Sequence, residues 1–125
     1  MNPFEEGVTA ALGLHAVLTR ALADRVERTV QGMAYRFFYN PMWGFWGDRS
    51  AGPAGTYYHR SSSVGELFWH MFDQVLLRPD LMHKVHDLMI VDCIQGEHLV
   101  SGPSSLPRAA DYSDHLPLVF RLDLD

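Results

Sequence analysis

Leu116-Pro117-Leu118-Val119-Phe120-Arg121-Leu122-Asp123-Leu124, near the end of the chain, is the stretch that decides the expected fold. Apolar residues occupy every even-numbered position, which is the period of a β-strand with one buried face. Three earlier stretches, residues 35–39, 72–77 and 88–94, also suit strands by their β-branched, aromatic and aliphatic residues. Most of the chain after residue 34 is therefore predicted to be rich in strands.

The first third of the chain is predicted to be helical instead. Aliphatic residues recur every four positions at Leu14, Leu18, Leu22 and Val26, so their side chains would share one face of an amphipathic helix. Gly32 is a suitable helix stop. Helices that precede the strands, rather than alternate with them, indicate an α+β protein.

Length and composition limit the classes of protein to which the chain can belong. The chain has 125 residues, with 10 Lys and Arg against 15 Asp and Glu, so its net charge is −5. This is the length of one domain, and we expect residues 1–125 to form a single unit. The arginines are scattered and form no basic stripe, which disfavours tight nonspecific binding of nucleic acid.

Compartment follows from the cysteine count and from the apolar runs. Cys93 is the one cysteine, which excludes an internal disulfide framework, and its apolar neighbours predict an inert core thiol. No apolar run approaches the roughly 20 residues of a membrane helix. The first residues lack the basic and apolar regions of a signal peptide. The sequence therefore predicts a cytoplasmic protein with no transmembrane segment.

Seven histidines raise the hypothesis of a metal site. His83 and His86 are three residues apart, but no cysteine or second histidine pair accompanies them at the spacing of a zinc finger. A small zinc-binding protein is therefore the weakest alternative. The other histidines outside the C-terminal motif are expected to be surface or hydrogen-bonded residues: His15, His59, His70 and His98.

Ser113-Asp114-His115 stands at the junction between a loop and the last strand, a place where functional residues gather. Neighbouring residues of a strand point to opposite faces, so Asp114 and His115 would serve different partners. Asp73 lies in an otherwise apolar predicted strand, where a carboxylate needs a partner and an imidazole is a good one. The spacing allows Asp73 to orient His115, and a capping or turn role is the alternative.

The segment Ser113-Asp114-His115-Leu116-Pro117, followed by an alternating strand, resembles the closing motif of the endonuclease/exonuclease/phosphatase superfamily, which has the deoxyribonuclease-I-like fold. Phe72-Asp73-Gln74-Val75-Leu76-Leu77 resembles an upstream strand of that family, in which an Asp precedes apolar residues. Asn2-Pro3-Phe4-Glu5 resembles the segment after its Gly-Asp-x-Asn motif. The resemblance implies the C-terminal part of an α/β/β/α sandwich, with helices first and then mostly antiparallel strands.

The resemblance also implies roles for particular residues. His115 would contact the scissile phosphate as a general base or as a stabiliser of the transition state, with its imidazole oriented by Asp73. Asp114 would lie near the metal or the attacking water. A divalent cation, Mg²⁺ or Mn²⁺, would polarise the phosphoryl oxygen.

The implied substrate is a phosphodiester or phosphomonoester, which leaves nucleic acid and phospholipid or inositol phosphate as open alternatives. Tyr57, Tyr58 and Trp69 are able to stack a base or pack a lipid, and we take Tyr58 and Trp69 as the substrate contacts. Core packing is the alternative role for Trp69.

The sequence also departs from the family pattern. The early metal-binding Glu, the early Asn, the mid-chain His or Tyr and the Gly-Asp-x-Asn motif have no counterparts, and Asp48 has no Asn two places later. We therefore expect a weak metal site and little or no hydrolase activity in this chain alone. The alternative function is a non-catalytic binding or oligomerisation module on the same scaffold. In either case the expected partners are a missing N-terminal half or a second copy.

Overall fold

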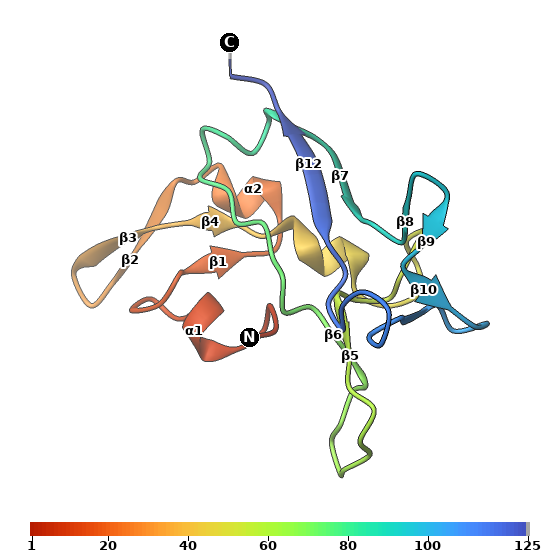
Figure 1. Cartoon of the computed structure of the whole chain (residues 1–125). Coiled ribbons are helices and arrows are strands. Elements are labelled where there is room, and N and C mark those ends of the chain that lie inside the picture. Colours follow the sequence, from red (N-terminus) through yellow and green to blue (C-terminus); the bar gives the residue numbers. More distant parts are fainter. Residues whose placement is uncertain (125) are drawn as a thin grey trace.

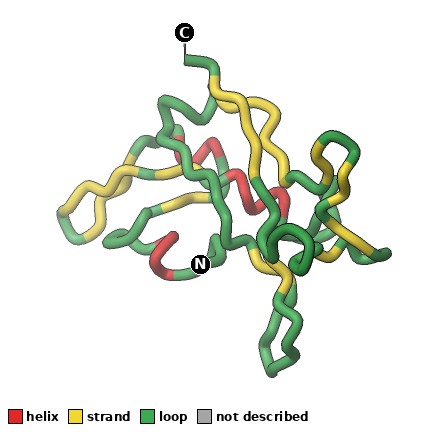
Figure 2. The backbone as a smooth tube through the Cα atoms, in the orientation of Figure 1, coloured by secondary structure: helices red, strands yellow, loops and turns green. Residues whose placement is uncertain are grey.

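The computed structural model describes residues 1–124 and consists mainly of short strands joined by loops (Figures 1 and 2). Helix is limited to two α-helices of four residues and one 3-10 helix of five. The expected helices-first α+β arrangement, as the C-terminal part of an α/β/β/α sandwich, is therefore wrong, because the described chain is sheet-rich with little helix. The elements are, in chain order, α1 (Glu6–Thr9), β1 (Ala16–Val17), α2 (Arg20–Ala23), β2 (Glu27–Val30), β3 (Met33–Arg36), β4 (Phe38–Tyr39), η1 (Pro41–Phe45), β5 (Tyr57–Tyr58), β6 (Trp69–His70), β7 (Val85–Ile90), β8 (Cys93–Ile94), β9 (Glu97–His98), β10 (Val100–Ser101), β11 (Leu106–Pro107) and β12 (Leu118–Leu122).

The long helix expected in the first third is reduced to α2. This helix begins after Thr19, whose hydroxyl accepts a hydrogen bond from the backbone N–H of Leu22 at 3.3 Å. Val26 then takes a φ of 66°, so the chain turns into β2 instead of continuing as helix. Leu18, Leu22 and Val26 are exposed, so no neighbouring surface buries the face on which the prediction depended. Short helices need such burial, because their first turn is costly to form.

Each described sheet has two strands, and β1–β4 is the parallel pair among antiparallel ones. The expectation of mostly antiparallel pairing is therefore met, although the strands are shorter than predicted. The longest pair, β7–β12, contains a bulge, because one residue of β12 between Val119 and Arg121 faces two of β7. Phe120 lies at this bulge and is 44% exposed, whereas strict alternation predicts it on the buried face.

Two other predicted strands differ in the structure. Residues 72–77 are extended loop, and their one strand-like contact is an isolated bridge between Leu77 and Tyr39. The stretch 88–94 is divided between β7 and the β8–β9 hairpin, whose turn uses positive φ at Gln95 and Gly96. Cys93 is exposed in this hairpin, so the prediction of a core thiol is wrong. The cause is that β7 ends at Ile90, so Cys93 lies in the exposed hairpin that follows and not in the predicted strand.

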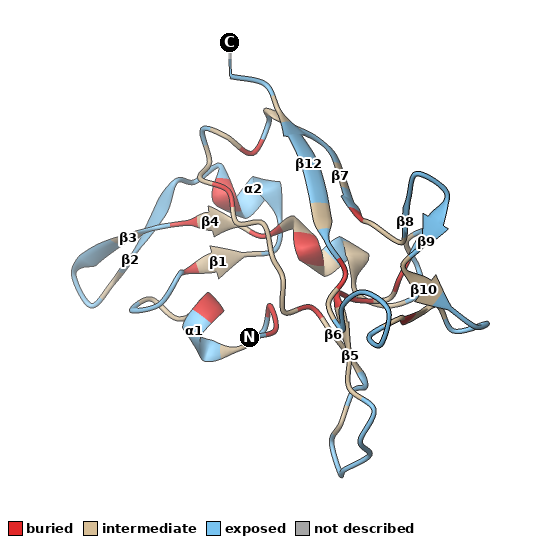
Figure 3. Cartoon of the chain, in the orientation of Figure 1, coloured by how far each residue is buried: buried red, intermediate tan, exposed pale blue. Residues whose placement is uncertain are grey.

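The core consists of two small groups of buried side chains (Figure 3). Met71 and Leu116, which belong to the larger group, hold the two loop segments that carry Asp73 and His115. Within residues 1–124, no helix is long and apolar enough to cross a membrane. The larger group is Met42, Met71, Ile90 and Leu116, and the smaller is Ala23, Leu77 and Met82.

Candidate functional site

Asp73 and His115 lie together in the structure, although 42 positions separate them in the chain. Oδ2 of Asp73 is 2.7 Å from Nδ1 of His115, and each side chain is 41% exposed. The pairing that the sequence predicts is therefore present. The prediction of a buried Asp73 inside a strand is wrong, because residues 72–76 run as loop along the surface.

Thr56 connects the segments that carry the Asp73–His115 pair. Its backbone N–H donates to the carbonyl of His70 (2.9 Å), and its own carbonyl accepts from the N–H of Leu116 (2.8 Å). Its hydroxyl oxygen accepts from the backbone N–H of Asp73 (3.1 Å). The residue is completely buried, so these contacts are shielded from water. The sequence around Thr56 does not indicate this role, because a short β-prone stretch carries no pattern that depends on long-range contacts.

The hydrogen bond also determines which nitrogen of His115 is free. An ionised carboxylate only accepts, so Asp73 requires the proton of the imidazole on Nδ1. In residues 1–124 no hydrogen bond involves Nε2, which is left with a lone pair when the ring is neutral. A histidine held in this way by a carboxylate can take a proton at Nε2 or, once charged, donate one to an oxyanion.

The pair lines a cavity of about 540 Å³, which Gln74, Ser113 and residues 116–118 also line. Oγ of Ser113 accepts from the backbone N–H of His115 at 3.0 Å, which holds the loop in place before β12. The cavity is shallow and open to solvent, so a ligand would reach the imidazole without any movement of the chain.

Asp114 lines a different cavity of about 400 Å³. Asp114 and His115 precede β12 rather than lie in a strand, so the strand alternation that the sequence predicts for them does not apply. Tyr58 and Arg60 line the same cavity as Asp114, and Nη2 of Arg60 donates to the carbonyl of Pro107 at 3.4 Å. The carboxylates of Asp73 and Asp114 therefore do not converge on one point.

A divalent cation is the group that the resemblance implies, and the described residues do not form a complete site for it. Across residues 1–124, no three side chains of His, Cys, Asp or Glu are arranged to hold a metal ion. Mg²⁺ takes six oxygen ligands, of which one or two are usually carboxylates. Asp114 by itself supplies one such ligand, and waters and the phosphate oxygens of a substrate are the other ligands that Mg²⁺ usually has.

The two predicted substrate contacts, Tyr58 and Trp69, pair across β5–β6 with ring centroids 5.3 Å apart, edge to face. Trp69 lines a third cavity with Trp46, whose indole N–H donates to the carbonyl of Trp69 at 3.1 Å. The two rings therefore open onto different cavities. Tyr57 is nearer to the Asp73–His115 pair, because its ring centroid is 5.0 Å from that of His115.

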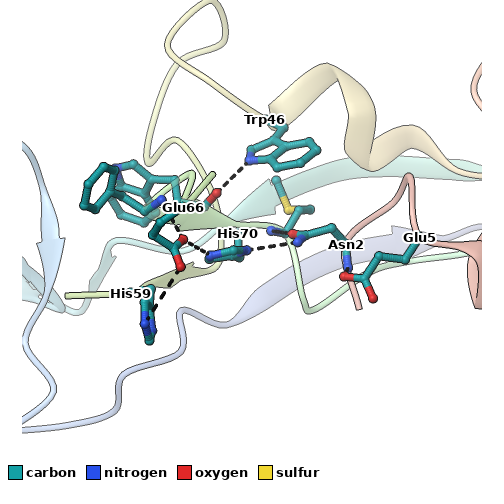
Figure 4. Close-up of polar contacts among 9 residues, drawn as sticks. Asn2, Glu5, Trp46, His59, Glu66 and His70 are labelled. Atoms are coloured by element: carbon teal, nitrogen blue, oxygen red, sulfur yellow. Dashed lines mark hydrogen bonds and ion pairs between the residues drawn. The ribbon is translucent and has the colours of Figure 1, made fainter. Parts of the chain in front are cut away.

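A second acid–imidazole contact joins Glu66 and His70 (Figure 4). Oε1 of Glu66 is 2.6 Å from Nε2 of His70, and Oε2 is 3.8 Å from Nε2 of His59. The hydrogen bond from His70, followed by that from the backbone of Phe68, lowers the pKa of Glu66. Nδ1 of His70 in turn lies 2.9 Å from Nδ2 of Asn2, which is almost completely buried. The sequence predicts hydrogen bonding for His70 but not this buried partner.

Within residues 1–124, the remaining histidines belong to no group of side chains arranged to hold a metal ion. His83 pairs with Asp24 at 3.3 Å and His86 with Asp123 at 3.1 Å, so the two have different carboxylates as partners. His15 is buried and accepts from Nε of Arg28 at 3.0 Å. Burial, and then the charge of Arg28, lower the pKa of His15. These residues therefore have structural partners, which leaves the Asp73–His115 pair as the candidate site.

Comparison of the chain with protein-family models, with curated proteins and with solved structures finds no significant match.

Proposed function

We propose that this chain carries part of the active site of a metal-dependent hydrolase acting on phosphodiester or phosphomonoester bonds in the cytoplasm. The observation that supports the proposal best is the 2.7 Å contact between Asp73 and His115 at the mouth of an open cavity. A carboxylate-oriented imidazole with a free Nε2 has the chemistry to contact a phosphoryl oxygen or to accept a proton from water. The resemblance of residues 113–117 to a known hydrolase motif supports the same reading.

The proposal includes a dependence on other polypeptide for metal binding. Asp114 is the proposed Mg²⁺ or Mn²⁺ ligand, but the described residues supply no complete set around it. Phosphoryl transfer relies on cations to neutralise the charge of the transition state. We therefore expect this chain alone to bind a phosphate ester weakly and to turn it over slowly or not at all.

Tyr58 and Trp69 remain the proposed substrate contacts, and they act on separate parts of the ligand because they open onto different cavities. Aromatic faces accept either a base or the apolar part of a lipid. The proposal therefore covers nucleic acid as well as phospholipid and inositol phosphate.

The test of this function is a binding experiment at the Asp73–His115 pair. NMR of the labelled full chain monitors the binding. Bis(nitrophenyl) phosphate, titrated at constant ionic strength with Mg²⁺ present, should shift the signals of Asp73, Ser113 and His115 in a saturable way. H115Q should abolish these shifts, because glutamine cannot supply the charged imidazole. H83Q is the matched control, since His83 pairs with Asp24 on the exposed surface, and it should behave as the wild type.

Absence of any saturable shift in the wild type would contradict the proposed function. The same substrate, assayed for release of nitrophenolate, should show no difference between wild type and H115A. A clear loss of rate on this substitution would contradict the expected inactivity of the isolated chain.

A second candidate function is a non-catalytic binding or oligomerisation module. The observation in its favour is the apolar surface of the β7–β12 sheet, where Met89, Val119 and Phe120 are each about half exposed. Exposed apolar patches of this kind mark interaction surfaces. A second copy of the chain is the proposed partner.

A further inference from the structure

The contacts of Asn2 determine the orientation of its side-chain amide. The backbone N–H of Met71 can only donate, and it lies 2.9 Å from the oxygen of that amide, Oδ1. The amide nitrogen, Nδ2, therefore faces Nδ1 of His70 at 2.9 Å (Figure 4). Because an amide NH₂ group only donates, Nδ1 of His70 has to accept.

The other nitrogen of His70 has the opposite requirement. Glu66 is held ionised at neutral pH, since its pKa is lowered by the contact with His70. Its carboxylate accepts a hydrogen bond, so Nε2 of His70, at 2.6 Å, carries the proton. The two neighbours together select one form of the ring, which is neutral and protonated on Nε2.

Asn2 connects this ring to the candidate site. Met71, whose N–H it binds, is fully buried and stands two residues before Asp73. The rings of His70 and Phe72 stack with centroids 4.7 Å apart, which covers the same stretch from the side. Any change at Asn2 would therefore be transmitted to the backbone that places Asp73 opposite His115.

We infer that Asn2 and His70 are positioning residues for Asp73, and that they act only while His70 is neutral. A second proton on His70 would fall on Nδ1 and point at the NH₂ group of Asn2. If the amide rotated to accept that proton, its NH₂ group would face the N–H of Met71 instead. Either arrangement puts two donors together, so one hydrogen bond of the buried Asn2 side chain is lost. The link from Asn2 and His70 to Met71 rests on geometry alone, and its consequence for Asp73 rests on the proposed function.

Several charged or titratable groups surround His70. Glu66 lies on the same hairpin as His70, and the ring of His59 meets the ring of His70 edge to face with centroids 6.4 Å apart. Tyr57 lies 6.2 Å away on β5. From the N-terminal segment, Glu5 acts through Asn2, whose backbone N–H donates to it. A proton on His59 would be attracted by the same carboxylate, so the two imidazoles compete for Glu66.

The test is NMR of the ¹⁵N-labelled full chain, with the signals of His70 identified by comparison with H70Q. At about pH 8, long-range ¹H–¹⁵N spectra should show His70 protonated on Nε2 and not on Nδ1. The protection of the Met71 amide against exchange should be lower at about pH 5 than at about pH 8. After correction for the intrinsic rate, the expected fall is about tenfold, as for the loss of one hydrogen bond.

The matched variant is N2D, which replaces the NH₂ donor by an acceptor of the same shape. Its carboxylate is able to accept from Met71 and also from a proton on Nδ1 of His70, so protection of the Met71 amide should persist at about pH 5. H83Q is the surface control and should retain the wild-type pH dependence.

The inference is overturned if His70 carries its proton on Nδ1 at about pH 8, or if Met71 is equally protected at both pH values. The wild-type measurement decides this even if N2D fails to fold. If the protection of the Met71 amide does not change with pH while bis(nitrophenyl) phosphate still binds at His115, only the positioning role is contradicted. If that protection changes with pH but bis(nitrophenyl) phosphate does not bind, only the proposed function is contradicted.

Discussion

Thr56 shows how one side chain places a two-residue site. Asp73 and His115 approach to 2.7 Å because both of their segments are hydrogen-bonded to Thr56, through its hydroxyl and its carbonyl respectively. Two exposed side chains at the surface gain little from their mutual contact alone. We conclude that the position of the pair depends mainly on the buried threonine beneath it.

We predict that T56V destabilises the protein by about 1–3 kcal/mol, the usual cost of a buried N–H left without an acceptor. Valine has nearly the shape of threonine, so packing is retained and the loss falls on the N–H of Asp73. Urea unfolding should show a lower midpoint, and the amide proton of Asp73 should shift. T56S, which keeps the hydroxyl, should preserve the Asp73 signal, and an unchanged signal in T56V would contradict the assigned contact.

At the scale of elements, the ends of the strands and helices lie at turns, even where the apolar periodicity of the sequence continues. The β2–β3 hairpin reverses at Gln31 and Gly32, whose φ angles are 50° and 80°. Positive φ at both central residues defines the tight turn that suits the right-handed twist of a hairpin. The sequence predicts Gly32 as a helix stop. Its turn conformation is therefore expected, but the strand that precedes it is not.

We predict that G32A destabilises the protein by about 1–2 kcal/mol, because an alanine at positive φ is strained. A Cβ atom at this position would meet nothing within 4 Å, so the cost is conformational and not steric. G44A is the matched control, since Gly44 also has open space around it and has no positive φ. Denaturant unfolding should separate the two variants, and equal midpoints would contradict the turn assignment.

At the scale of the whole molecule, the six two-stranded sheets and two small buried groups of residues 1–124 leave much apolar surface uncovered. The β7–β12 sheet is the longest element of this surface, and Met89, Val119 and Phe120 are each about half exposed on it. An antiparallel pair with two unpaired edges is also a template for further strands. The fold therefore favours a partner at this sheet.

We predict that the chain associates with itself as its concentration rises, and that the double variant V119T/F120T shifts the equilibrium toward monomer. Light scattering coupled to size-exclusion chromatography measures the mass directly. V64T is the control, since Val64 is fully exposed but lies outside the β7–β12 sheet, and it should associate like the wild type. A monomeric wild type at every concentration would argue against this interface.

The sequence by itself determined the features that depend on neighbours along the chain. These are the strand-rich character of the chain after residue 34 and the turn conformation at Gly32. Backbone geometry and alternation act over two to four residues, so they are readable locally. The contact between Asp73 and His115 was one of two alternatives predicted from the sequence, and it is present although Asp73 is not buried in a strand as that prediction assumed.

Only the tertiary structure decided which surfaces become buried. The apolar spacing from Leu14 to Val26 suits a helix, yet no other segment covers that face, so the helix stops at four residues. Thr56 and Asn2 acquire their roles from segments far away in the chain, which no local pattern records. The physical reason is that burial and hydrogen bonding of a side chain depend on the segments that pack against it, whereas sequence pattern records only what the chain offers to them.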